Sequence, residues 1–136
     1  MELLSQAGRA KQILEENSSY YLPMAELTGT LWENMTTSAS CNHGFAAHIA
    51  RVLYRDALGV YDISPAEKNV TIRFNDCGLK HCKGSIPVSE KSVDVEWKIE
   101  GDKMNATVVV PEGWNVDHLT SGFEDITLNL SVINGK

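Results

Sequence analysis

The spacing of apolar residues changes near residue 62, and this change divides the chain into two parts. Before that point, apolar residues recur every three or four positions, which is typical of amphipathic helices. After it, apolar and polar residues alternate, as they do in half-buried β-strands. We therefore expect an α+β chain, with helices in residues 1–61 and a β domain in residues 62–136.

The first part should contain two helices joined as a hairpin. One is expected from about residue 2 to residue 21, with Pro23 stopping or kinking it. The other is expected from about residue 44 to residue 58, with Gly59 at its C-terminal end. The apolar stripe of the first helix consists of Leu3, Leu4, Ala7, Ala10, Ile13 and Leu14.

Two helices alone cannot bury two apolar stripes, because each stripe needs a further element to cover it. We therefore expect the helical part to present an unusually large apolar surface in this chain, or to bury it in a symmetric contact. The missing cover would be another part of a longer chain or a second copy.

The second part should contain about five short strands. Glu100 to Lys103 is typical of the turn of a hairpin, and Pro87 predicts an edge strand or a loop around Ile86. A short linker, roughly residues 61–68, should keep the β domain packed against the helices. The clearest alternating segments are residues 70–74, 93–99, 104–110 and 126–133. Strands in this regular short spacing predict a small antiparallel β-sandwich.

Composition and charge exclude several classes of protein. Apolar residues make up 43% and charged residues 22% of the chain, as in ordinary soluble proteins. No apolar run approaches the roughly 20 residues of a membrane span. The net charge is −6 and no basic stripe is present, which argues against a nucleic-acid partner. Residues 1–20 do not resemble a signal peptide, although a lost N-terminus would hide one.

The three cysteines do not form a complete disulfide framework, because their number is odd. Cys77 and Cys82 could pair within one loop. Together with His81 they also suggest a metal site, but the spacing matches no standard zinc pattern and a fourth ligand is missing. We expect neither a metal nor a cofactor.

The candidate chemistry lies in the segment between the two helices, which has no clear periodicity. Trp32 precedes Glu33 there; tryptophan faces stack on sugars, and a carboxylate can deprotonate water. His43 follows ten residues later and could hydrogen-bond a sugar hydroxyl. The same residues are also typical of a core aromatic, a solvated acid and a helix start.

Two motifs in this region resemble a known family. Gly29 to Glu33, followed by Ser40 to Phe45, is similar to the end of the (α/α)6 barrel in glycoside hydrolase family 78, the bacterial-type α-L-rhamnosidases. The resemblance extends over about residues 1–118. It implies that residues 1–61 are the last helices of a barrel and residues 62–136 the C-terminal β-sandwich domain. Further similar segments are residues 53–55, 58–60, 72–74, 83–87 and 109–113.

The resemblance also implies a function. Enzymes of this family remove terminal α-L-rhamnose from glycosides with inversion. Glu33 would be the general base, and His43 and Trp32 would contact the sugar. The general acid would lie upstream in the barrel, outside this chain, so the chain alone should be inactive. One departure concerns the shape of the sugar pocket, because Asn34 and Met35 stand where the family often has an aromatic residue.

The implied partners are rhamnose-containing glycosides and either the upstream barrel portion or a second copy of this chain. The sequence does not determine the compartment, and a bacterial cytoplasm, a periplasm and secretion all stay open. An alternative is a non-catalytic module that binds carbohydrate or protein. A reading frame upstream that encodes the rest of a barrel would favour the hydrolase.

Overall fold

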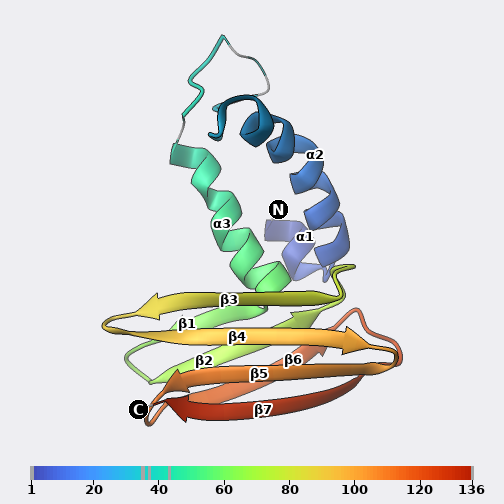
Figure 1. The fold of residues 1–136 in the computed structure, drawn as a ribbon, viewed down its shortest axis with the longest axis vertical. Helices are drawn as coiled ribbons and strands as arrows, with labels where there is room; N and C mark the ends of the chain where they lie inside the picture. The colour runs from blue at the N-terminus through green and yellow to red at the C-terminus, as the bar shows by residue number, and fades with distance from the viewer. Residues whose placement is uncertain (1, 35, 37, 43, 136) are drawn as a thin grey trace.

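The chain folds into a helical segment that stands on a β-sandwich (Figure 1). The computed structural model describes residues 2–34, 36, 38–42 and 44–135. The helical elements are α1 (Glu2–Gln6), α2 (Ala10–Thr28), the 3-10 turn η1 (Gly44–Ala47), α3 (His48–Val52) and the π-helical η2 (Leu53–Leu58). The strands are β1 (Val60–Ser64), β2 (Asn69–Asn75), β3 (His81–Val88), β4 (Lys91–Glu100), β5 (Lys103–Pro111), β6 (Asn115–Ser121) and β7 (Thr127–Gly135). The expected fold class is thereby confirmed.

The first helix begins at Glu2 as expected, but it is broken at Gly8 and ends later than expected. Gly8, with a φ of 69°, breaks it into α1 and α2. Pro23 does not stop it, because α2 continues to Thr28 and ends at Gly29, whose φ is 70°. The last turns of α2 lean over in Figure 1, as expected where proline removes a helix hydrogen bond. Met24 is fully buried, so packing holds the turn that follows the proline.

The second helical stretch covers residues 44–58 as expected, but it is not one regular helix. It passes from 3-10 to α to π geometry along its length. Gly59 ends it with a φ of 102°, and its N–H donates to the carbonyl of Tyr54 at 3.1 Å. The left-handed backbone at this position explains why glycine is needed there.

The sandwich has two more strands than the sequence predicted. One sheet has the order β1-β2-β6 and the other the order β3-β4-β5-β7. β1 lies across the expected linker and the expected domain boundary, and β6 was not predicted. Three pairings are antiparallel, but β2 with β6 and β5 with β7 are parallel. Parallel strands are joined by long connections and not by a tight turn, so the sequence contains no turn motif that predicts these two pairings.

Two local expectations for the β domain are confirmed. Glu100 and Lys103 face each other across the β4–β5 hairpin, and Gly101 in the turn has a φ of 63°. Pro87 lies in β3, which is one of the two edge strands of its sheet. A proline without an N–H is tolerated there because one side of the strand needs no partner.

The core of the sandwich also holds the end of the helical segment. Leu58, in the last turn of η2, is buried among core side chains of both sheets. The indole N–H of Trp97 in β4 donates to the carbonyl of Leu58 at 3.1 Å. A Cβ on Gly84 would stand 2.8 Å from Cδ2 of Leu58, so β3 needs glycine at this contact. The fully buried core side chains include Val70, Ile72, Phe74, Val93, Val95, Trp97, Met104, Val108 and Val110.

A buried charge cluster joins the helices to the sandwich. The carboxylate of Asp56 has no solvent exposure and accepts hydrogen bonds from Arg55 and Arg73, each at 2.8 Å. The hydroxyl of Ser5 in α1 donates to Asp56 at 2.6 Å. Arg55 also binds Glu2 at 2.6 Å. The guanidinium of Arg73 stacks 4.3 Å from the centre of the Tyr61 ring.

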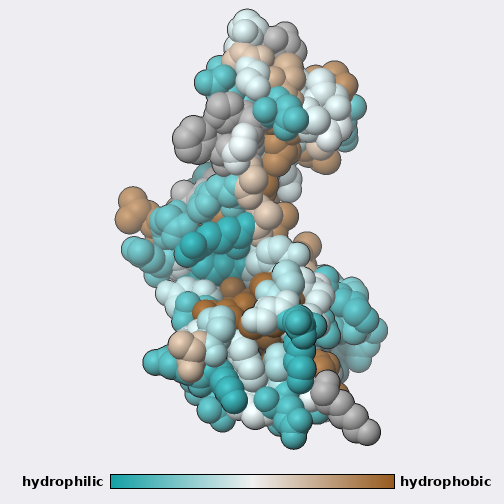
Figure 2. Space-filling view, turned by 90° about the vertical axis from the view of Figure 1, so that its left-hand side faces the viewer, coloured by the Kyte–Doolittle hydropathy of each residue, from teal (hydrophilic) through white to brown (hydrophobic). Residues whose placement is uncertain are grey.

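Apolar side chains remain exposed on the helical segment, as expected because two helices alone cannot cover both apolar stripes. Leu3 is 81% exposed and Leu27 is 72% exposed. Ile13, by contrast, is fully buried within the chain. Figure 2 shows apolar surface on the helical end of the molecule, above the mixed polar surface of the sandwich. Among the described residues, no helix is long and apolar enough to cross a membrane.

Neutralising Asp56 should destabilise the whole chain. In Asp56→Asn, Arg55 and Arg73 keep their buried charges and lose the carboxylate that compensates them. Breaking a buried pair in this way costs about 3–5 kcal/mol. Urea unfolding followed by circular dichroism measures the change. The same neutralisation of the exposed Glu67, in Glu67→Gln, should change the stability by less than about 0.5 kcal/mol. Equal losses in both variants would contradict this role for the cluster.

The pH dependence of stability should contain a contribution from Glu2. Its hydrogen bond from Arg55 holds the pKa of Glu2 below the ordinary value. A depressed carboxyl pKa stabilises the fold above the ordinary value of about 4.3, and this contribution is lost as the pH falls through the lower, folded pKa. Glu2→Gln should therefore lose less stability on acidification than the wild type, although the effect is small because Glu2 is half exposed. Urea unfolding at several pH values between about 3 and 6, the range around the ordinary carboxyl pKa, measures this effect. Glu15→Gln is the control.

Candidate functional site

The candidate site lies on the loop between α2 and η1, at the end of the molecule farthest from the sandwich (Figure 1). Side-chain and backbone hydrogen bonds fold this loop back on itself. The hydroxyl of Thr30, near its start, donates to the carbonyl of Cys41, near its end. The N–H of Glu33 donates to the carbonyl of Ser40 at 2.9 Å. The two halves of the loop therefore lie side by side.

The carboxylate of Glu33 stands at the middle of this arrangement. Its Oε2 is 3.4 Å from the N–H of Ser40, and the side chain is exposed. Arg55 lies at the junction with the sandwich, where it is bound to Glu2 and Asp56. In the part of the chain that the structure describes, Glu33 forms no ion pair with Arg51 or Arg55. Water can reach the carboxylate, as a general base requires.

Trp32 is an anchor of the loop in this structure. It is 5% exposed, and its indole N–H donates to the hydroxyl of Thr28 at 2.7 Å. Its backbone N–H points at the sulfur of Met24, 3.4 Å away. Burial leaves the faces of the indole without access to a ligand from solvent. The predicted contact of Trp32 with a sugar remains a prediction for a complete enzyme.

His43 lies outside the described residues, and so does Met35. The predicted closeness of His43 to Glu33 and its contact with a sugar therefore remain predictions. The neighbouring Cys41 and Gly44 are described, and Cys41 is tied to Thr30 across the loop.

An apolar groove runs between α2 and α3, below the loop. Its volume is about 320 Å³. Leu31, the neighbour of Trp32, lines its upper part. Burial raises the pKa of Tyr21, another lining residue. The other apolar residues that line it are Leu14, Leu22, Ala25, Ile49 and Leu53. The helical stripes predicted an uncovered surface, but only the fold shows that it forms a groove beside the Glu33 loop.

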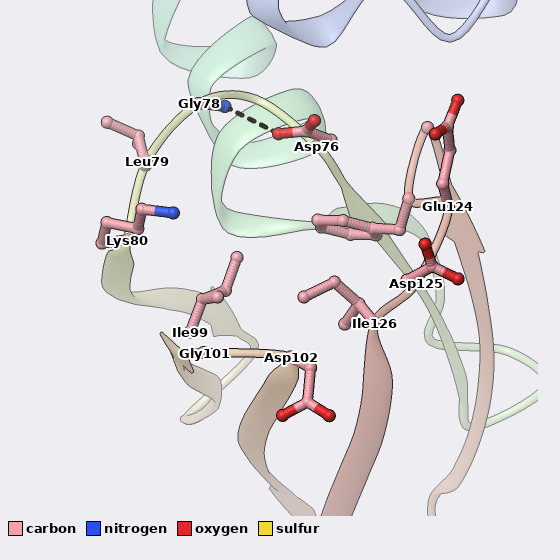
Figure 3. A pocket seen from close by; sticks show the side chains of 12 residues that line it. Asp76, Gly78, Leu79, Lys80, Ile99, Gly101, Asp102, Glu124, Asp125 and Ile126 are labelled. Carbon is pink, nitrogen blue, oxygen red and sulfur yellow. Dashed lines mark hydrogen bonds between the residues drawn. The ribbon is translucent and has the colours of Figure 1, made fainter.

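A second hollow, of about 580 Å³, opens at one end of the sandwich. Ile99 and Ile126 point into it, whereas the carboxylates of Asp102 and Glu124 point away (Figure 3). Asp76 accepts a hydrogen bond from the N–H of Gly78 at 3.2 Å. The acidic residues at this end therefore do not converge as a pair of catalytic carboxyls would.

The cysteines are all free thiols in this structure. Cys77 and Cys82 are not joined, and burial raises the pKa of both thiols. His81 faces Glu96 in β4, with 3.3 Å between its Nε2 and the carboxylate. Among the described residues, no group of three or more histidine, cysteine or acidic side chains is placed to hold a metal ion.

Comparison with known proteins gives a structural match. No family model matches the chain, and no curated protein matches it. A solved structure, the GH78 family rhamnosidase of Bacillus sp. GL1, has the same fold over 98% of this chain, with a TM-score of 0.85 and 23% sequence identity. The chain spans about 15% of the length of that protein. The helical hairpin and the sandwich of this chain thus share the fold of one part of a family 78 rhamnosidase, as the sequence motifs predicted.

Proposed function

We propose that this chain is the C-terminal part of an inverting glycoside hydrolase that removes terminal α-L-rhamnose from glycosides. It would supply the general base and lack the general acid, and so be inactive alone. The observation that carries the proposal is the fold match over nearly the whole chain, combined with an exposed Glu33 on the loop where the resemblance places the base.

The chemistry requires a second carboxyl group. An inverting glycosidase holds its acid and its base about 6.5–9.5 Å apart, with the attacking water beside the base. Glu33 would accept the proton of that water, and its carboxylate must be ionised to do so. A protonated acid on the opposite face of the sugar must donate to the leaving oxygen, and one carboxyl group cannot fill both places.

The loop gives Glu33 a defined position for this role. Two hydrogen bonds tie it to Ser40, one through its backbone N–H and one through its carboxylate. The Thr30 contact to Cys41 closes the loop next to it. In the described part of the loop the backbone donor binds one carboxylate oxygen, and the other accepts no hydrogen bond from a described residue.

The apolar groove provides the surface on which the upstream barrel portion would dock. Its lining is almost entirely apolar, and two helices cannot cover it themselves. Docking there would complete the helical array and bring the missing acid toward the loop that bears Glu33.

Reconstitution tests the proposal. The chain, the polypeptide encoded directly upstream of it, and their mixture are each incubated with a synthetic chromogenic α-L-rhamnoside. We expect release of the chromophore from the mixture and from neither part alone. Leu22→Asp in the groove should raise the concentration of chain needed for activity, whereas Leu119→Asp on β6 should not. Release by the chain alone, or none from a folded mixture, would overturn the proposal.

Replacing Glu33 tests its role in the reconstituted enzyme. Glu33→Gln keeps the shape and removes the base. Because water is deprotonated in the transition state, kcat should fall by roughly 10²–10⁴-fold with little change in KM. Glu26→Gln, an exposed neutralisation near the end of α2, serves as the matched control and should keep full turnover. A Glu33→Gln enzyme with near-normal kcat would show that this residue is structural.

A second candidate function is a non-catalytic module that binds a protein. The apolar groove favours it, because an open apolar surface between two helices suits a packed helical partner, whereas the buried indole of Trp32 offers no face to a sugar. The reconstitution experiment separates the two functions: a tight complex with the upstream polypeptide that releases no sugar would support the binding module.

A further inference from the structure

Among the described residues, one side of the β7 backbone has no partner strand. It stands at the end of its sheet, paired only with β5, over residues 127–135. The other strands at sheet edges are β1, β6 and β3. An edge strand offers a row of free N–H and C=O groups that can pair with another chain, and natural proteins usually protect such edges.

The other edge strands carry such protection, and β7 carries none. β3 contains Lys83 and Pro87, β6 contains Asp117, and β1 is short and contains Asp62. Charge, proline and short length each discourage pairing of a foreign strand. β7 is longer than these three strands and consists of TLNLSVING, without a charge or a proline.

The side chains of β7 are also incompletely covered. Leu128 and Leu130 face the core and are only half-buried. Val132, on the same face by strand alternation, is 44% exposed, and Ile133 on the opposite face is 50% exposed. The apolar interior of the sandwich is therefore open along this edge.

From these features we infer that β7 pairs with β7 of a second copy of this chain, antiparallel about a twofold axis. The inference is independent of the proposed hydrolase. A second strand there satisfies the free backbone groups and continues the four-stranded sheet into the second copy. The axis passes through Ser131, because this register sets Leu130 opposite Val132 of the other copy and so covers the open apolar edge of both.

The occupant is a second copy because the strand complements itself. On either side of Ser131, the core face of β7 carries an apolar side chain, Leu130 before it and Val132 after it. β7 has no charged residue, so pairing with its own copy brings no like charges together. Each chain carries a net charge of −6, so the contact should tighten with salt rather than weaken. A single strand pair is a small interface, and we expect a weak dimer with a Kd on the order of 0.1 mM.

Sedimentation equilibrium of the full chain, over a wide range of concentration and at two salt levels, measures the dimer. Val132→Lys should raise its Kd by about tenfold or more. Leu119→Lys, on the β6 edge with the same 44% exposure, should leave the Kd unchanged. The urea midpoints of both variants show whether they fold. A wild-type chain that stays monomeric, or a folded Val132→Lys chain that dimerises normally, would overturn the inference.

A cysteine at the axis tests the register directly. In Ser131→Cys, the new thiols of two copies face each other, and oxidised glutathione should convert the dimer to a disulfide-linked form that peptide mapping assigns to position 131. Thr120→Cys, on the exposed β6 edge, should cross-link no more than the wild type, whose own thiols set the background. Linkage at position 131 no faster than at position 120 would exclude this pairing and leave the helical groove as the surface of any self-association.

Discussion

Asp56 places a carboxylate at the junction of the helices and the sandwich, where it has no contact with solvent. A buried charge is costly unless hydrogen bonds and opposite charges compensate it. Its partners come from three directions: Ser5 from α1, Arg55 from its own helix, and Arg73 from β2. These elements therefore have to keep fixed positions relative to one another, and the helices stand on the sandwich as one body.

The charges in this cluster balance. Asp56 and Glu2 face Arg55 and Arg73, and the ring of Tyr61 covers the second guanidinium. Leu58 extends the same junction into the apolar core, where Trp97 binds its carbonyl. Charge pairing and core packing thus act at the same few residues. The junction orients α3, and with it the base of the loop that carries Glu33.

In the described part of the chain, the end of the helices farthest from the sandwich has no comparable charge pairing or core packing. The groove between α2 and α3 is apolar and open, and the loop above it is tied mainly by its own hydrogen bonds. The groove and the β7 edge are both uncovered, but different interactions would stabilise a partner at each. The groove can gain from burial of side chains, whereas the edge can gain from backbone pairing. A partner for one therefore need not compete with a partner for the other.

The sequence by itself determined the switch from helix to strand near residue 62, the hairpin at Gly101, the helix end at Gly59 and the apolar excess of the helices. Each of these is a local pattern or a backbone requirement of one residue. It also predicted Glu33 as an exposed acid on the loop between the helices. Only the tertiary structure decided that Pro23 lies within a helix and that Trp32 is buried. It also decided that β6 pairs in parallel with β2 and β7 with β5, and that Asp56 binds Ser5 and Arg73. Those features depend on residues far apart in the chain, and their energies come from burial and charge pairing that exist only once the elements have come together.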